Sequence, residues 1–255
     1  MKTSIPMTLL ALLLFAACQS QSLNPYPTIG AIPPPPGFHR IAADGNSFAF
    51  WLRMVALKKD RTVYLFDGTR KRYQGAQYTV LDITVGHTDL QQCADAVMRL
   101  RAEYCYARRY LAKIDFYSEQ GARFNFLEWS RHRPDSAGRA SFNAYLNKVF
   151  MYCSTRTLER QLVPAFLKEV DPGDVLIKGG APGHAMLVVD VAEDDGGHRV
   201  YLLAQSYMPA QDIHIVNNPT DSRLSPWYSA DAASGPIETP EWTFTTNQLR
   251  TWPGK

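Results

Sequence analysis

The chain has 255 residues and carries 27 Lys and Arg against 24 Asp and Glu, a formal net charge of +3. Charged residues of both signs are mixed along the sequence, so it lacks the basic stripe of a nucleic-acid-binding protein and we expect no nucleic-acid partner. The length is enough for one large or two small lobes with a substantial core, and no internal repeat of the kind that builds solenoids is seen.

Residues 1–17 have the features of an export signal. The positive charge of Lys2 precedes a short apolar run, Met7–Phe15, which is too short to span a bilayer stably. Small residues then lead to Cys18, an arrangement that resembles a bacterial lipoprotein signal, in which Cys18 becomes the lipid-modified first residue. We expect an exported protein anchored to the membrane through Cys18, on the periplasmic side of the cell envelope; an ordinary secretory signal is the alternative.

Residues 18–37 have the composition of a tether. They contain few apolar residues and end in four consecutive prolines, Pro33–Pro36, which favour stiff polyproline geometry. The sequence therefore predicts that the folded part begins near Phe38 and forms a single domain over residues 38–252.

Hydrophobic periodicity and turn residues predict a mixture of helices and strands along this domain. In the first half of the domain we expect a helix over Phe48–Leu57 behind a cap at Ser47, strands at Val63–Phe66 and Gln77–Val85, and a helix over Leu90–Tyr104. Strand-like segments near Asp115 and Arg123 follow, and then helices at Ser141–Phe150 and Thr157–Leu167. The second half continues with a strand at Val175–Ile177, a hairpin of Ala185–Val191 with Arg199–Ala204, and a strand at Ile213–Val216.

The first candidate for chemistry is Cys93, in the first turns of the helix predicted at Leu90–Tyr104. Backbone N–H groups and the helix dipole lower the pKa of a thiol at such a position and favour the nucleophilic thiolate. The side-chain amides of Gln91 and Gln92 are placed to donate hydrogen bonds to a developing oxyanion. The alternatives are a small buried cysteine on an apolar helix face and two solvated glutamines.

The number of cysteines leaves one thiol over. If Cys18 carries the lipid, the exported chain keeps Cys93, Cys105 and Cys153, an odd number for an oxidising compartment. Cys93 and Cys105 lie twelve residues apart on one predicted helix, roughly 18 Å by the helical rise, so they cannot form a disulfide with each other. A Cys105–Cys153 bridge would leave Cys93 free, and no bridge at all remains open.

The second candidate is His184, which follows the Gly- and Pro-rich loop 179–183 and opens a strand. A histidine there can titrate near neutral pH and face a cleft as a general base; the alternative is a loop histidine that caps the strand. Gln205 ends the return strand of the hairpin, where its amide oxygen could fix the imidazole; it could also be a simple ladder or turn residue. No Cys/His spacing fits a zinc site, and we expect neither a metal nor a cofactor.

The order of these features resembles that of the papain-like cysteine amidases. A cysteine begins a helix, Gly173–Ile177 forms a strand, Gly183-His184 opens a second strand, and a polar residue closes the third. The likeness is greatest to the CHAP and NlpC-type domains that cut peptide amide bonds in peptidoglycan. It implies an α+β, papain-like fold in which a helix carrying Cys93 packs on an antiparallel sheet or partial barrel carrying His184, with a helical insertion between them.

Over nearly all of residues 38–252 the chain also resembles a bacterial lipoprotein family known as domain of unknown function forty-eight forty-six. The segments that carry this likeness are Asp89–Ala96, Pro182–Ala185 and Leu203–Gln211.

The amidase resemblance implies that Cys93 is the nucleophile, His184 the general base and Gln205 the orienting residue, with Gln91 or Gln92 as oxyanion donor. The expected function is that of a cell-envelope cysteine amidase or peptidase acting on peptide amide bonds, with peptidoglycan stem peptides as a candidate substrate. The Asp or Gly pattern that usually surrounds the cysteine of the cell-wall amidases is missing. Transfer to an amine acceptor and an inactive envelope binding or scaffold lipoprotein on the same fold are the alternatives.

Two aromatic segments near the C-terminus, Ser225–Tyr228 and Glu241-Trp242, are candidates for the wall of a substrate groove. Packing in the core or at its rim is the alternative for both.

Overall fold

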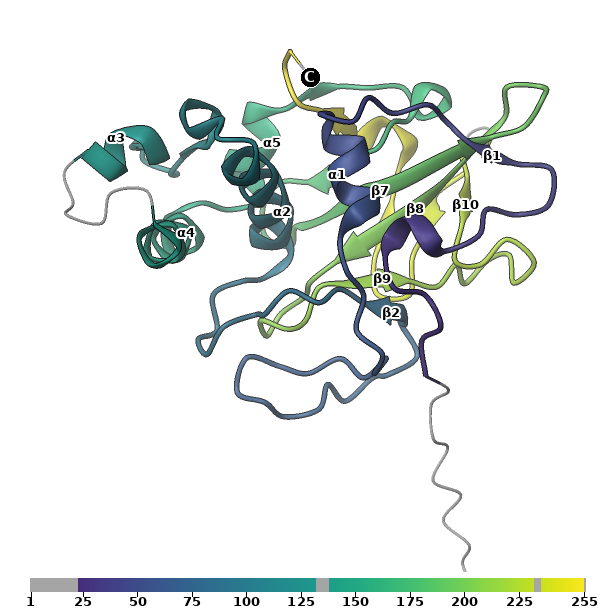
Figure 1. The fold of residues 1–255 in the computed structure, drawn as a ribbon, viewed down its shortest axis with the longest axis horizontal. Coiled ribbons are helices and arrows are strands. Elements are labelled where there is room, and N and C mark those ends of the chain that lie inside the picture. The colour runs from purple at the N-terminus through teal and green to yellow at the C-terminus, as the bar shows by residue number, and fades with distance from the viewer. Residues whose placement is uncertain (1–22, 132–137, 232–234, 255) are drawn as a thin grey trace, which may run out of the picture.

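The computed structural model describes residues 23–131, 138–231 and 235–254 and shows a mixed α/β fold built on one large antiparallel sheet (Figure 1). The export signal and the lipidation of Cys18, both predicted from the sequence, lie outside these residues. Within the described ranges, no helix is both long and apolar enough to cross a membrane.

The described residues form five α-helices: α1 (Phe48–Met54), α2 (Cys93–Ala107), α3 (Phe126–Arg131), α4 (Arg139–Tyr152) and α5 (Thr155–Gln161). The predicted cap of α1 is present, because the hydroxyl of Ser47 accepts a hydrogen bond from the backbone N–H of Phe50 at 3.1 Å. Helix α2 begins at Cys93 rather than Leu90. Its start is fixed by Asp95, whose carboxylate accepts the backbone N–H of Gln92 at 3.0 Å.

The main sheet has nine strands, and every pairing in it is antiparallel. Seven strands follow the order β2-β9-β8-β7-β6-β13-β5, with β1 paired to β7 and β10 paired to β8. Their bounds are β1 (His39–Arg40), β2 (Gln77–Val80), β5 (Val163–Pro164), β6 (Val175–Lys178), β7 (His184–Glu193), β8 (Arg199–Gln205), β9 (His214–Val216), β10 (Tyr228–Ser229) and β13 (Leu249–Thr251). Two small hairpins complete the strands: β3 (Asp115–Tyr117) with β4 (Arg123–Asn125), and β11 (Ile237–Glu238) with β12 (Thr243–Phe244).

The central strand β7 is covered on both faces, which explains its nearly continuous apolar sequence. Leu187 and Val189 belong to a core between the sheet and the helices, whereas Met186 and Val188 belong to a second core on the opposite face. Helix α2 packs directly on β7. This contact brings the first residue of α2, Cys93, toward the start of the same strand.

The segment before Phe38 is part of the packed structure. Ile29 and Ile32 are fully buried in the core between the sheet and the helices. The backbone carbonyl of Pro33 accepts a hydrogen bond from the indole N–H of Trp227 at 2.9 Å. The packed structure therefore begins earlier than the predicted boundary near Phe38, because two isoleucines near the proline run provide apolar surface that the core covers.

The stretch between α2 and His184 contains α3, α4, α5 and the hairpin β3–β4. Figure 1 shows α3 and α4 standing outside α2, on the side away from the long strands. Helix α5 begins at Thr155 rather than Thr157, because the Ser154 hydroxyl caps it by accepting the backbone N–H of Thr157, and it ends at Gln161 rather than Leu167.

Cys93, Cys105 and Cys153 are all free thiols. The Cys105–Cys153 bridge that the sequence allowed is not formed. Cys105 is fully buried in the core between the helices and the sheet, where it packs as a small apolar side chain.

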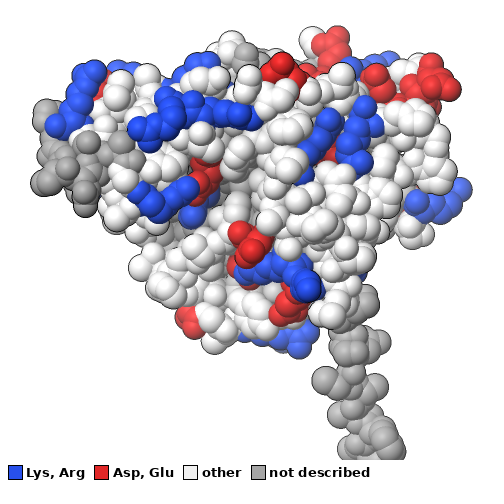
Figure 2. All heavy atoms as spheres, in the orientation of Figure 1, with Lys and Arg blue, Asp and Glu red and all other residues white. Residues whose placement is uncertain are grey.

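On the face shown in Figure 2, basic and acidic side chains are interspersed rather than gathered into a patch of one sign.

Candidate functional site

A cavity of about 570 Å³ lies between the start of α2, the end of α4, the loop before β7 and the β11–β12 hairpin. Its wall includes Cys93 and Asp95 from α2, Cys153 after α4, His184 from β7 and Trp242 from the hairpin. The sequence-predicted nucleophile and base therefore face one common space, although ninety-one residues separate them along the chain.

The side chains of Gln205 and His184 are in contact. His184 is the first residue of β7, and Gln205 is the last residue of the neighbouring antiparallel strand β8. His184 Nε2 lies 2.7 Å from Gln205 Oε1. The amide nitrogen of Gln205 donates to Glu241 Oε2 at 2.8 Å, so its oxygen faces the imidazole. His184 Nε2 must then carry the proton, which leaves Nδ1 as the basic nitrogen of the ring.

Behind Gln205 lies a chain of polar contacts that sequence reasoning did not find. Glu241 Oε2 pairs with Lys71 Nζ at 2.6 Å, and both side chains are largely buried. Gln205 Nε2 also lies 3.3 Å from His214 Nε2, which can accept because His214 Nδ1 donates to the backbone carbonyl of Asp212 at 2.9 Å. Each group thus fixes the orientation of the next.

Three aromatic side chains surround the imidazole of His184. Its ring centroid lies 4.9 Å from that of Tyr207, 5.3 Å from Trp242 and 5.9 Å from Phe244. Burial lowers the pKa of His184 to about 4, and the positive charge of Lys71 lowers it further, whereas the hydrogen bond that the ring donates to Gln205 raises it. The ring is therefore neutral, and able to act as a base, at neutral pH.

Cys93 is the first residue of α2, but its thiol does not have the low pKa that its position at the helix start suggested. The backbone N–H of Ala185, the residue after His184, hydrogen-bonds to the sulfur and lowers its pKa. Burial outweighs this contact, and with the nearby Asp95 it raises the pKa of Cys93 to about 11. The free site therefore holds a neutral thiol beside a neutral imidazole.

The two predicted oxyanion donors have different surroundings. Gln92 lines the cavity, and its amide nitrogen donates to Asp89 Oδ1 at 3.1 Å. Gln91 is buried and does not line the cavity, because its amide oxygen accepts from Arg99 Nη1 at 2.9 Å. Of the two glutamines, only Gln92 is therefore positioned to contact a ligand bound at Cys93.

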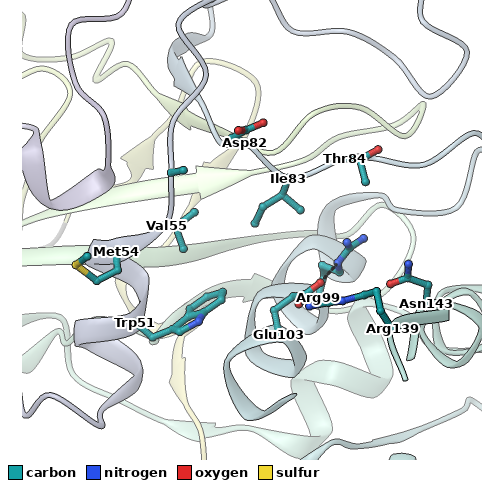
Figure 3. Close-up of a pocket in the computed structure, with 11 residues that line it drawn as sticks. Trp51, Met54, Val55, Asp82, Ile83, Thr84, Arg99, Glu103, Arg139 and Asn143 are labelled. Atoms are coloured by element: carbon teal, nitrogen blue, oxygen red, sulfur yellow. Dashed lines mark hydrogen bonds and ion pairs between the residues drawn. The ribbon is translucent and has the colours of Figure 1, made fainter. Parts of the chain in front are cut away.

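Arg99 belongs to a second cavity, of about 430 Å³, between α1, α2 and α4 (Figure 3). Arg99 Nε pairs with Glu103 Oε1 at 3.0 Å, and Glu103 Oε2 pairs with Arg139 Nη1 at 2.7 Å. The two guanidinium groups thus share one carboxylate, and a wall of Trp51 and Ile83 faces them. This cavity brings together no nucleophile and base.

Of the two aromatic segments proposed for a groove, only one lines the cavity. Trp242 stands at its edge beside His184. Trp227 and Tyr228 are buried in the two cores, so they pack rather than bind. No cluster of three or more His, Cys, Asp or Glu side chains suited to a metal ion occurs within the ranges 23–131, 138–231 and 235–254.

The fold and the cavity define a mixed α/β protein in which a half-buried thiol and a buried histidine, hydrogen-bonded to Gln205, line one site. The chain belongs to the family described as Domain of unknown function (4846), whose model matches residues 30–251. No curated protein and no solved structure matches the chain.

Proposed function

We propose that the protein is a cysteine amidase or peptidase with a papain-like arrangement of Cys93, His184 and Gln205. The observation that carries the proposal is the hydrogen bond of 2.7 Å between His184 Nε2 and Gln205 Oε1, in a cavity that His184 shares with Cys93. This bond fixes the ring and its tautomer, which is the task of the third residue in a nucleophile–base–orienter set.

The reaction starts from the neutral pair. As the Cys93 sulfur attacks an amide carbonyl, its proton passes to Nδ1 of His184. The backbone N–H of Cys93, which has no partner within α2, and the amide of Gln92 stabilise the oxyanion. The imidazolium then protonates the leaving amine, and an acyl-thioester remains on Cys93. Water, deprotonated by His184, attacks this thioester and releases the carboxylic acid and the thiol.

The substrate class is a peptide amide, and the stem peptides of peptidoglycan are the first to test. The signal at residues 1–17 and the lipid on Cys18, both expected from the sequence, would hold the enzyme on the periplasmic side of the envelope. The same chemistry with an amine in place of water would give a transferase.

A second candidate function is that of a catalytically inactive envelope binding or scaffold lipoprotein. It is favoured by the burial that raises the pKa of Cys93 to about 11 and lowers that of His184 to about 4, since such a pair forms no thiolate–imidazolium ion pair at neutral pH.

The pH dependence of Cys93 alkylation by iodoacetamide separates the two functions. The experiment uses the full chain with Cys18→Ser, Cys105→Ala and Cys153→Ala, so that Cys93 is the only thiol. If His184 removes the proton during attack, the rate will be nearly constant above about pH 5 and will fall as His184 becomes protonated. An unassisted thiol will instead react about tenfold faster per pH unit up to the pKa of Cys93.

His184→Ala provides the control, since it should convert the flat profile into the steep one. A steep profile in the parent chain would exclude base-assisted attack and would favour the second candidate function, an inactive binding or scaffold lipoprotein. A flat profile justifies assays of peptide amide hydrolysis, for which Cys93→Ala is the inactive reference.

A further inference from the structure

Asp95 has a feature that the proposed chemistry does not use. It lies two positions after Cys93 on α2, is 7 % exposed and lines the same cavity as Cys93. Its Oδ2 accepts the backbone N–H of Gln92 at 3.0 Å, whereas Oδ1 has no hydrogen-bond partner among the described residues. A buried carboxylate oxygen without a partner is costly, so its position at a cavity points to a ligand that supplies the missing donor.

The charges of the cavity indicate the sign of that ligand. Among its described lining residues, only Asp89 and Asp95 carry carboxyl groups, and no Lys or Arg is present. Asp89 Oδ1 is already occupied, because it accepts from Gln92 Nε2 at 3.1 Å and from the backbone N–H of Ala210 at 2.7 Å. Asp89 is also exposed to solvent, so Asp95 Oδ1 is the buried acceptor without a partner that a cationic ligand would meet.

Two basic side chains that contact residues around His184 are engaged elsewhere. Lys71 is paired with Glu241 behind Gln205, outside the cavity lining. Lys178 places its ammonium group 5.9 Å from the ring centroid of Trp242 and does not line the cavity. Neither neutralises Asp95.

The apolar surroundings of Asp95 suit the stem of an aliphatic amine. Phe150 and Met151 at the end of α4 line the cavity together with Asp95. A lysine-like side chain, or another primary amine on a short alkyl chain, could lay its methylene groups against these residues and place its ammonium group at the carboxylate.

We propose that Asp95 is a specificity-determining residue that binds a primary ammonium group of the substrate within reach of Cys93. This inference rests on the proposed function, because the ligand is taken to be the substrate of Cys93. Burial raises the pKa of Asp95 to about 8, so the free carboxyl is mostly protonated at neutral pH. Binding of an alkylammonium group releases this proton to solvent and leaves an ion pair of carboxylate and ammonium.

The test measures how the charge of a small reagent changes its reaction with Cys93. The full chain with Cys93 as its only thiol is treated with 2-aminoethyl methanethiosulfonate, which is cationic, and with the neutral propyl reagent of similar size. The measured quantity is the rate with the cationic reagent divided by the rate with the neutral reagent. We expect this ratio to be at least tenfold larger for Cys93 than for a small free thiol. In Asp95→Asn this preference should fall to that of the free thiol.

Asp89→Asn is the matched control. It removes the other carboxylate of the cavity, whose Oδ1 is already hydrogen-bonded, and should keep most of the preference. The proposal would be overturned by equal preferences in Asp95→Asn and the parent chain, or by a loss that is the same in the two variants.

A second measurement is independent of any reaction at Cys93. In the full chain with Cys93→Ala, NMR titration with butylammonium chloride should shift the carboxyl resonance of Asp95 and lower its pKa, whereas 1-butanol should do neither. No response to butylammonium would overturn the assignment of Asp95. If the alkylation profile is steep while this response is present, the proposed catalysis fails and the ammonium site stands.

Discussion

The two walls of the Cys93 cavity differ in how their polar groups are satisfied. On the sheet side, His184 Nε2, both ends of the Gln205 amide and the carboxylate of Glu241 all have partners within the protein. On the α2 side, Asp95 Oδ1 has none among the described residues. A wall with satisfied groups holds its geometry before a ligand arrives, whereas a wall with an unsatisfied group gains a partner only when the ligand binds.

The largest expected effect comes from breaking the sheet-side wall at its charge pair. Glu241→Ala leaves the Lys71 ammonium group, 9 % exposed, without its partner. We expect the free energy of unfolding to fall by about 3–5 kcal/mol, measured by urea denaturation. The double variant Lys71→Met/Glu241→Gln removes both charges and keeps an acceptor for Gln205, so it should recover most of the loss. A single variant as stable as the parent would show that the pair does not support this wall.

The two walls should also respond to pH in opposite directions. His184 has a folded-state pKa of about 4, below its ordinary value of 6.5, so the unfolded chain binds more protons between these values. The free energy of unfolding therefore decreases by about 3 kcal/mol as pH falls from 6.5 through 4, and His214, lowered to about 3 by burial, adds to this decrease. Denaturation at a series of pH values measures the slope.

Asp95 works against this trend from the helix side. Burial raises its folded-state pKa from 3.8 to about 8, so its favourable contribution is present at low pH and is lost as pH rises through 8. Asp95→Asn should remove the loss of stability that Asp95 causes between about pH 4 and pH 8, so the curve should rise more steeply from pH 4 to 6.5 and become flatter from pH 6.5 to 8. The comparison of the walls would fail if His184→Gln and Asp95→Asn changed the slope of stability against pH in the same direction between pH 4 and 6.5.

Loss of the orienting residue should have a smaller effect, and on reactivity. Gln205→Leu removes the acceptor of His184 Nε2, so the ring is no longer held in one orientation and tautomer. We expect alkylation of Cys93 at pH 7 to slow by roughly 10–100-fold, as for other groups that orient a reactive histidine. Because the base is still present, the profile should stay flat above about pH 5, unlike that of His184→Ala. An unchanged rate would remove Gln205 from the site.

The smallest effect is expected at the two glutamines before Cys93. Gln92→Ala should slow peptide amide hydrolysis by less than about tenfold, because its amide nitrogen is shared with Asp89. Gln91→Ala should leave the hydrolysis rate unchanged, since the Gln91 side chain is turned toward Arg99. Steady-state hydrolysis rates of the two variants show which glutamine contributes to oxyanion stabilisation. A larger effect at Gln91 than at Gln92 would assign that role to Gln91.

Local chemistry accounts for what could be predicted about the fold. The cap at Ser47, the hairpin of β7 and β8 and the helix that carries both Cys93 and Cys105 follow from cap residues, turn residues and hydrophobic period. The boundary at Phe38 could not be found in this way. Composition favours a tether for residues 18–37, but burial of Ile29 and Ile32 depends on surfaces that only the folded core provides.

The candidate site shows the same division. Cys93, His184 and Gln205 were predicted because each stands at the end of an element with a recognisable sequence signal. Glu241 and Lys71 have no such signal, since they join the site through pairing across 170 positions of the chain. The pKa of Cys93 was predicted in the wrong direction, because its position in the helix is local whereas its burial is not.

The sequence by itself determined the kind and order of most elements of this protein, and it placed Cys93, His184 and Gln205 near the ends of such elements. Helix periodicity, capping and turn chemistry act over a few residues, which is why they can be read without the fold. Only the tertiary structure decided how those side chains are charged and held. Desolvation and hydrogen bonding depend on groups that packing brings together from distant positions, and these make the thiol neutral, fix the imidazole and leave one oxygen of Asp95 for a ligand.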